Sequence, residues 1–81
     1  MKGMRRKKMS NRKLPFDCFV GTEAETVTNP FSGESVLLEP QAVAVYDTIM
    51  GAQMFNDFKT VRKGLDWFRR YFPAEYMVLL D

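Results

Sequence analysis

The chain has 81 residues with no histidine and a single cysteine, and its formal net charge is +2. These counts exclude imidazole catalysis, intrachain disulfides and thiolate zinc sites. The apolar content of 46% suffices for one small core of marginal stability, to which homo-oligomerisation or docking on a partner would add. No apolar run approaches the roughly 18 residues of a membrane span, so we expect a cytoplasmic protein without a membrane partner.

The small net charge hides a segregation of charge along the chain. Residues 1–13 carry seven cations, whereas residues 14–58 carry seven carboxylates and no lysine or arginine. Five cations and one carboxylate then follow in residues 59–72. Because surface charge controls encounter and partner choice rather than fold, this pattern indicates a binding protein.

Residues 1–13 contain almost nothing that could be buried, so we predict a flexible basic arm before a single domain at 14–81. Neutralising phosphates releases counterions and gives affinity without sequence preference, which makes the arm a candidate nucleic-acid-binding segment. An acidic protein surface would attract the same arm, and a merely solvated tail is the third interpretation. The candidate residues are Lys2, Arg5, Arg6, Lys7, Lys8, Arg12 and Lys13.

A β-hairpin is predicted around residues 29–33. Asn29 opens the turn, Pro30 sets φ at the next position, and Gly33 supplies the left-handed residue needed for the chain to return. The flanking segments 25–28 and 34–38 carry strand-forming residues. Residues 16–20 are a candidate third short strand.

Two helices are predicted after the hairpin. Pro40 suits the first position of a helix, and apolar residues at 42, 45, 49 and 52, with a neighbouring stripe, make this helix the more deeply embedded one. Asn56 or Asp57 can cap the second helix. An apolar seam follows at spacings of three and four, and Pro73 ends the helix. The seam consists of Phe58, Val61, Leu65, Phe68 and Phe72.

These elements predict an α+β fold in which a small hairpin packs on two antiparallel helices. Residues 74–80 form either a short C-terminal helix or an edge strand, and we favour the helix. The predicted core consists of Val36, Leu38, Val45, Ile49, Val61, Leu65, Phe68 and Leu79.

The second predicted helix carries a basic face opposite its apolar seam. Its candidate nucleic-acid-binding residues are Arg62, Lys63, Arg69 and Arg70, which Lys59 accompanies. Trp67 and Tyr71 lie at the border of this face, where aromatic rings could stack on bases while arginines hold phosphate. The structural alternative is that Trp67 forms the edge of the core and the cations solvate the helix, with Asp66 joining Arg62 and Arg70 at i,i+4 spacing.

The seven carboxylates of residues 14–58 are a third candidate surface, which could recruit a basic protein partner. They are spread over loops, hairpin and helix ends, and none has the spacing of a calcium site. The chain also lacks a phosphate-binding glycine loop and a serine or cysteine beside a visible base. We therefore expect no enzymatic activity, no metal and no cofactor.

A family resemblance is carried by the Asn-Pro-Phe-Ser-Gly turn at 29–33, the helix start at Glu39 and Pro40, and the segment Asp-Trp-Phe-Arg-Arg-Tyr-Phe-Pro at 66–73. Over residues 26–81 the chain resembles small uncharacterised accessory proteins of tailed bacteriophages, particularly marine ones. No catalytic or binding motif defines that group, so the resemblance supplies no site residues. It implies a compact accessory protein expressed in the cytoplasm of a bacterial host.

Our leading hypothesis is a non-enzymatic accessory protein that binds nucleic acid through electrostatic contacts from the arm and the late helix. The competing hypothesis is a protein–protein interaction module that uses the acidic surface and exposed aromatic residues. Such a module could modulate a host factor or assemble with copies of itself in a virion.

Overall fold

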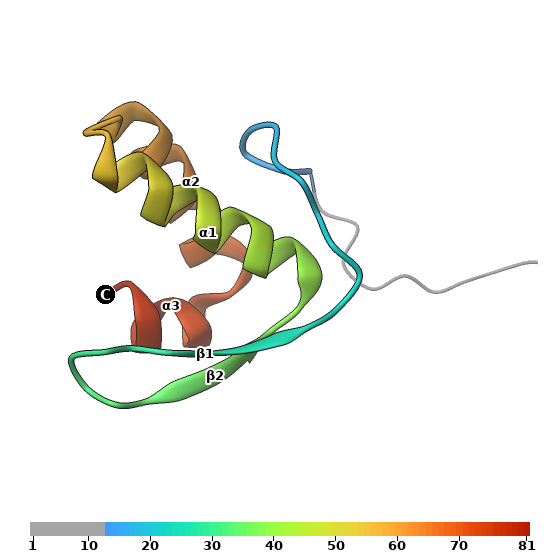
Figure 1. The fold of residues 1–81 in the computed structure, drawn as a ribbon, viewed down its shortest axis with the longest axis vertical. Helices are drawn as coiled ribbons and strands as arrows, with labels where there is room; N and C mark the ends of the chain where they lie inside the picture. Colours follow the sequence, from blue (N-terminus) through green and yellow to red (C-terminus); the bar gives the residue numbers. More distant parts are fainter. Residues whose placement is uncertain (1–12) are drawn as a thin grey trace, which may run out of the picture.

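The structure is a computed structural model that describes residues 13–81 (Figure 1). The predictions for residues 1–12 therefore lie outside the described part of the chain. The elements of residues 13–81 follow in the order β1 (Glu25–Thr28), β2 (Ser35–Leu38), α1 (Pro40–Met54), α2 (Phe58–Tyr71) and α3 (Pro73–Leu79). This arrangement confirms the α+β class, the hairpin, both long helices and the helical state of the C-terminal segment.

The hairpin turn forms as its residue types predict. Strands β1 and β2 pair antiparallel, with Val27 opposite Val36. The Asn29 side-chain oxygen accepts a hydrogen bond from the Phe31 amide at 2.8 Å, and Gly33 adopts a φ of +80° that favours glycine. The Asn29 amide group also donates to the Val78 carbonyl at 2.8 Å, so the turn is fastened to α3.

The predicted third strand at residues 16–20 is wrong, because the sheet of the described chain contains only β1 and β2. Residues 13–20 instead run beside the helices, away from the hairpin tip (Figure 1). Leu14, Phe16 and Cys18 pack against the core, so this segment gains burial from side-chain contacts with the helices rather than from strand pairing.

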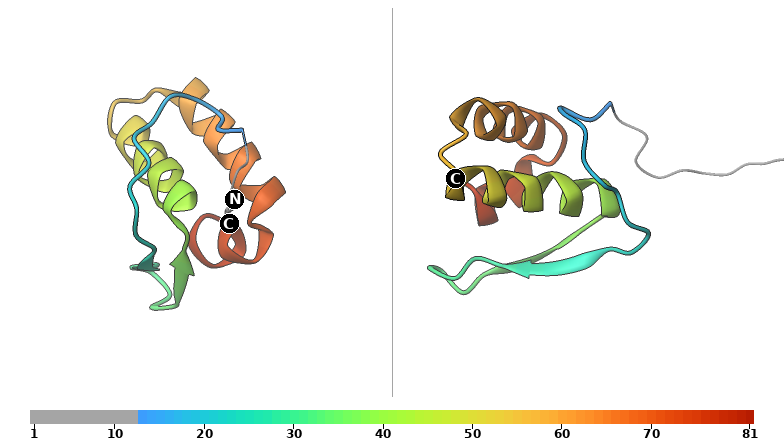
Figure 2. Two further views of the ribbon diagram at one scale, coloured as in Figure 1. Left: turned by 90° about the vertical axis from the view of Figure 1, so that its right-hand side faces the viewer. Right: turned by 45° about the horizontal axis from the view of Figure 1, so that its top comes forward.

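Helices α1 and α2 pack closely because glycine occupies the contact. A Cβ atom added to Gly64 would lie 2.4 Å from Cγ1 of the buried Ile49 side chain, which is too close for real atoms. Helix α1 begins at Pro40 as predicted, and α2 begins after Asp57, whose side chain accepts from the Thr60 amide at 3.3 Å. The two helices run in opposite directions (Figure 2).

The core lies where α1, α2, α3 and the hairpin meet. Strand β2 contacts both α1 and α3, and α2 contacts α1 and α3, so α3 helps to hold the hairpin in place. Among residues 13–81, no helix combines the length and apolar character needed to span a bilayer. The buried apolar residues are Leu38, Ala42, Ala44, Val45, Ile49, Ala52, Val61, Trp67, Phe68 and Phe72.

Five of the eight predicted core residues are buried, namely Leu38, Val45, Ile49, Val61 and Phe68. The other three are half-buried but pack against the core: Val36, Leu65 and Leu79.

Two aromatic residues of α2 differ from the seam pattern. Phe58, the first residue of α2, belongs to the seam and yet is 63% exposed. Trp67, expected at the border, is buried instead. The periodicity of a helix identifies its apolar face, but the neighbouring segments decide how far that face is covered.

Candidate nucleic-acid interface

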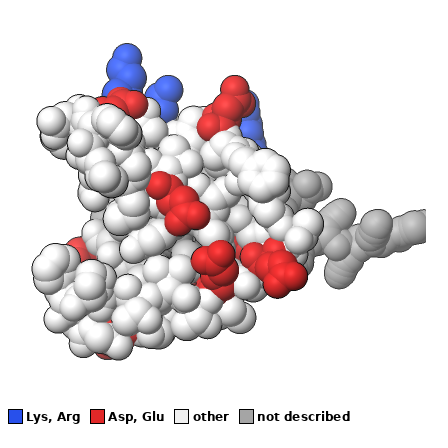
Figure 3. All heavy atoms as spheres, in the orientation of Figure 1, with Lys and Arg blue, Asp and Glu red and all other residues white. Residues whose placement is uncertain are grey.

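The basic face of α2 consists of five exposed cations on one helix. All of them lie on the side that points away from the core, and Figure 3 shows lysine and arginine side chains gathered along the upper edge of the molecule. Because exposed cations on one helix face produce a concentrated positive potential, this face suits a polyanion. Its members are Lys59, Arg62, Lys63, Arg69 and Arg70.

One arginine of this face is already partnered. The Arg69 guanidinium donates to the Asp66 carboxylate at 2.8 Å, and its central carbon lies 5.9 Å from the centre of the Tyr76 ring. Within residues 13–81 no ion pair joins Asp66 to Arg62 or Arg70, so the predicted i,i+4 ladder is replaced by one i,i+3 pair. Arg62, Lys63 and Arg70 are therefore the better placed cations for an external anion.

A hydrogen bond joins the end of the arm to the α2 basic face. The Trp67 indole N–H donates to the backbone carbonyl of Lys13 at 2.8 Å. Lys13, Trp67, Arg70 and Tyr71, with Leu14 and Asp66, line a groove of about 230 Å³. We call this groove the Lys13 corner. The sequence left open whether the arm and the α2 cations face the same way, and the Lys13 corner brings the last arm cation beside Arg70.

The aromatic residues of the Lys13 corner have separate roles. Trp67 is buried, with its ring centre 5.5 Å from that of Phe72 and 5.9 Å from that of Phe68, so it cannot offer a ring face to a base. Tyr71 is 38% exposed, and the Arg70 guanidinium lies 5.7 Å from the centre of its ring. The structural interpretation of Trp67 is thus confirmed, and Tyr71 is the ring that an unstacked base could reach.

Sequence reasoning did not find the contact between Trp67 and Lys13. The sequence offered only a general indication, which is that the N–H of a buried indole needs a hydrogen-bond acceptor. The acceptor is a backbone carbonyl 54 residues away, so no side-chain pattern could have identified it.

The N-terminus of α2 holds a second polar arrangement. The Asp57 carboxylate accepts from the Thr60 hydroxyl at 2.7 Å and from the Thr60 amide. These hydrogen bonds lower the pKa of Asp57 below its ordinary value, and the positive charges of Lys59 and Lys63 act in the same direction. The carboxylate therefore stabilises the helix and offsets part of the positive charge at this end of the basic face.

Of the eleven predicted nucleic-acid-binding residues, five lie in the described chain. Lys13, Arg62, Lys63, Arg69 and Arg70 are exposed there, and no carboxylate of residues 13–81 forms an ion pair with Lys13. The remaining six lie outside the described residues: Lys2, Arg5, Arg6, Lys7, Lys8 and Arg12.

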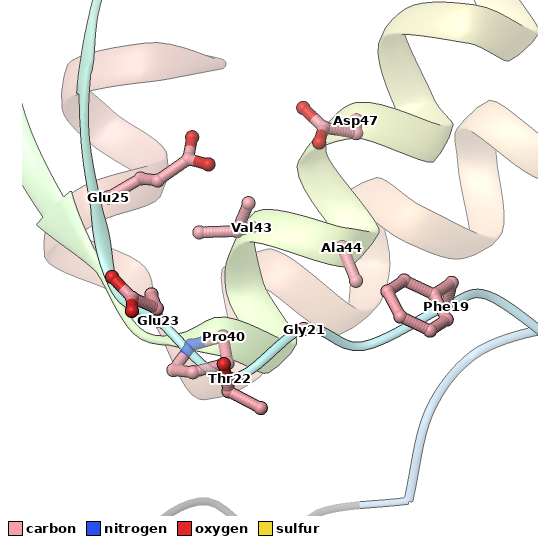
Figure 4. A pocket seen from close by; sticks show the side chains of 9 residues that line it. All are labelled: Phe19, Gly21, Thr22, Glu23, Glu25, Pro40, Val43, Ala44 and Asp47. Atoms are coloured by element: carbon pink, nitrogen blue, oxygen red, sulfur yellow. The ribbon is translucent and has the colours of Figure 1, made fainter.

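A separate acidic pocket lies between the segment before β1 and helix α1 (Figure 4). Three carboxylates border this pocket of about 320 Å³, namely those of Glu23, Glu25 and Asp47. Its apolar lining comes from the first turns of α1, and the 89% exposed Phe19 lies at its side. The tertiary structure thus gathers part of the acidic middle that looked scattered in the sequence.

Cys18 and the carboxylates show no arrangement for covalent or metal chemistry. Burial raises the pKa of the Cys18 thiol, and the negative charge of Asp17 raises it further. An activated thiol requires the opposite shift. In the described part of the chain, no three histidine, cysteine or carboxylate side chains are grouped to hold a metal ion.

No protein-family model, curated protein or solved structure matches this chain. The resemblance to tailed-phage accessory proteins therefore stays a prediction.

Proposed function

We propose that this protein is a non-enzymatic accessory protein that binds nucleic acid through electrostatic contacts. The cations of the arm and of the basic face of α2 would supply the contacts to phosphate. The proposal extends to the setting that the family resemblance implies, which is the cytoplasm of a bacterial host.

The observation that carries this proposal is the hydrogen bond between Trp67 and the Lys13 carbonyl. It fixes the attachment point of a segment with six further cations at the same corner as Arg70 and Tyr71. An arm that starts beside Arg70 could contact the same strand as Arg70, whereas an arm that starts on the opposite face could not. Affinity from such contacts is non-specific and falls steeply with salt.

Tyr71 and Arg70 would add a preference for single strands over duplexes. The Tyr71 ring is 38% exposed and already contacts Trp67 and Arg70, and its exposed part could add a stacking contact to an unpaired base while Arg70 contacts the adjacent phosphate. A duplex keeps its bases stacked internally and offers only phosphates to the same corner. We therefore expect single strands to bind more tightly than duplexes of equal length.

The acidic pocket favours one alternative function, a protein–protein interaction module. Glu23, Glu25 and Asp47 surround an apolar lining, which suits a partner segment that carries lysine or arginine beside an apolar residue. Under this alternative the pocket is the contact surface, and the arm contributes little to binding.

The test is a salt titration with nuclease-treated protein and random-sequence oligonucleotides. The full chain is compared with a chain lacking residues 1–12, which keeps the Lys13 carbonyl that accepts from Trp67. Each phosphate contact contributes about −0.9 to the slope of log affinity against log salt for duplex DNA. Loss of the six cations in residues 1–12 should make the slope shallower by about 5 units and abolish retention at physiological salt.

An Asp47→Asn variant is the control for the acidic pocket, because it removes a carboxylate there without touching the cationic residues and should leave the salt slope unchanged. An affinity that barely changes between about 50 and 200 mM salt would overturn the proposal. Equal binding by the full and truncated chains would overturn it as well. Capture of a basic protein that Asp47→Asn weakens would instead favour the alternative.

A further inference from the structure

A second groove borders the basic face of α2 on the side away from the Lys13 corner. It lies between α2 and α3 and has a volume of about 360 Å³. Phe58 and Trp67 are separated by about two and a half turns of helix, so the two grooves flank the basic face from opposite sides of α2. We call the second one the Phe58 groove. Its lining residues are Phe58, Val61, Arg62, Leu65, Asp66, Arg69 and Tyr76.

The Phe58 groove combines an apolar floor with an arginine at its rim. The Phe58 ring is 63% exposed, and the Tyr76 ring is half-buried. The Arg69 guanidinium lies 5.9 Å from the centre of the Tyr76 ring, whereas Arg62 is an exposed cation of the α2 basic face. The groove therefore suits a flat uncharged group that is linked to an anion.

The carboxylates nearest to the Phe58 groove are paired or offset by cations. Asp66, the only carboxylate among the lining residues, accepts from the Arg69 guanidinium at 2.8 Å. The Asp57 carboxylate precedes Phe58 in the chain, and it is under the influence of the positive charges of Lys59 and Lys63. The basic face thus keeps its attraction for anions up to the edge of the groove.

The Phe58 groove repeats the arrangement of the Lys13 corner. Each of the two has a partly exposed aromatic ring and an arginine of α2, namely Phe58 with Arg62 and Tyr71 with Arg70. Asp66 lines both, so the two grooves adjoin across the outer face of the helix. A ligand that fits both has flat groups that recur along an anionic backbone, which is the chemistry of a single-stranded nucleic acid.

We propose that the Phe58 groove is a second base-binding position for the strand that contacts the Lys13 corner. The inference rests on the proposed function, because the same strand must occupy both places. The strand crosses the outer face of α2, one base stacks on Phe58, and phosphates contact Arg62 and Lys63. The 14 residues of α2 extend over about 20 Å, which is about six nucleotides at the roughly 3.4 Å spacing of a stacked strand.

The test measures the affinity of the nuclease-treated full chain for oligothymidylates by fluorescence anisotropy. A strand of about twelve nucleotides spans both positions, whereas one of about three reaches only one of them and is attracted to the Lys13 corner by the arm. Phe58→Leu keeps an apolar side chain but removes the ring. It should lower the affinity for the longer strand about fivefold or more, with an unchanged salt slope because no cation is lost.

The same variant should leave the affinities for the shorter strand and for a duplex unchanged, because neither places an unpaired base on Phe58. Phe58→Trp offers a larger ring and should bind the longer strand at least as tightly as the wild-type chain. Phe55→Leu is the matched control, since Phe55 is 82% exposed and close to Phe58 in the chain but does not line the groove. It should not change any of these affinities.

Failure of the inference can be distinguished from failure of the proposed function. A wild-type chain that binds neither strand in a salt-dependent way would overturn both. Tight, salt-dependent binding that Phe58→Leu leaves intact would overturn the inference alone, as would a loss that appears equally with duplex or with Phe55→Leu. If Phe58→Leu weakens only the binding of an acidic peptide that contains tryptophan, the groove is a peptide site and the inference is wrong.

Discussion

The two ends of the α1–α2 pair have opposite surface chemistry although the same two helices build both. At one end, α2 finishes beside Lys13, and exposed cations surround a partly exposed tyrosine. At the other, α1 ends at Met54, and the exposed Met54 and Phe55 side chains precede the Asp57 cap of α2. The nucleic-acid contacts proposed for the first end are Coulombic, so salt should weaken them.

The middle of the helix pair holds these ends apart. Gly64 allows α2 to approach Ile49, and Trp67 continues the contact toward the Lys13 corner. Changes in the middle should therefore affect stability, whereas changes at the Lys13 corner should affect nucleic-acid binding.

The largest expected effect comes from crossed variants of the two ends. Lys13→Gln combined with Arg70→Gln removes two cations of the Lys13 corner and should weaken nucleic-acid binding roughly tenfold to a hundredfold at about 0.1 M salt. Phe31→Ser combined with Phe55→Ser, which changes two exposed rings away from that corner, should leave this affinity unchanged. Fluorescence anisotropy on a short oligonucleotide measures both affinities. An equal loss of affinity in the two double variants would mean that the Lys13 corner is not the contact surface.

The next largest effect concerns the contact between the helices. Gly64→Ala and Gly51→Ala gain the same helix propensity of about 1 kcal/mol, but only the first forces a Cβ against Ile49. At Gly51 nothing lies within 4 Å of an added Cβ. Overpacking costs about 1–3 kcal/mol, so the free energies of unfolding of the two variants should differ by that amount. Urea titration followed by circular dichroism measures both free energies of unfolding. Equal values would show that α1 and α2 can move apart slightly without losing stability.

A smaller effect is expected for Trp67→Phe at the Lys13 corner. The variant keeps an apolar ring but loses the hydrogen bond to the Lys13 carbonyl, which should lower the free energy of unfolding by about 1 kcal/mol. Amide exchange of residues 13–20 should also become faster, since that bond fastens the segment to α2. Tyr71→Phe, which leaves this bond intact, is the comparison. Unchanged exchange in Trp67→Phe would mean that the apolar contacts of Leu14 and Phe16 alone hold the segment.

The smallest effect depends on pH and concerns Asp57. Its folded-state pKa is lowered by the hydrogen bonds from Thr60, so its stabilisation is present above the unfolded pKa and is lost as the pH falls through the folded value. Asp57→Ala should be less stable than wild type at neutral pH, and the difference should shrink as the pH falls below about 4. Asp57→Asn keeps a capping side chain without a titrating group, so its cap should not weaken over that range. Thermal unfolding across the pH range measures all three, and a constant wild-type advantage over Asp57→Ala would contradict the role of ionisation.

Features that depend on local contacts agree with the predictions from the sequence, whereas features that depend on distant contacts do not always agree. The turn at Asn29 and Gly33 and the helix start at Pro40 were predicted, and the cap at Asp57 is one of the two predicted candidates, because each depends on residues within one turn of the chain. The strand predicted at 16–20 was wrong, since strand formation needs a partner and the helices offered those side chains a better contact.

The local sequence pattern also did not predict which aromatic residues of α2 are buried. Phe58 belongs to the apolar seam and yet is exposed, whereas Trp67 lies off the seam and yet is buried. The difference arises because residues 13–16 cover one side of α2 near its C-terminal end, while nothing in the described chain covers its first turn in the same way.

The amino-acid order by itself determined the separation of cations from carboxylates and the positions of the helices and hairpin. These properties depend on composition and on neighbours a few residues apart. Only the tertiary structure decided that Lys13 lies beside Arg70 and that three acidic side chains surround one pocket. Such groupings join residues up to 50 or more positions apart, and they exist only once a common core has fixed where each segment lies.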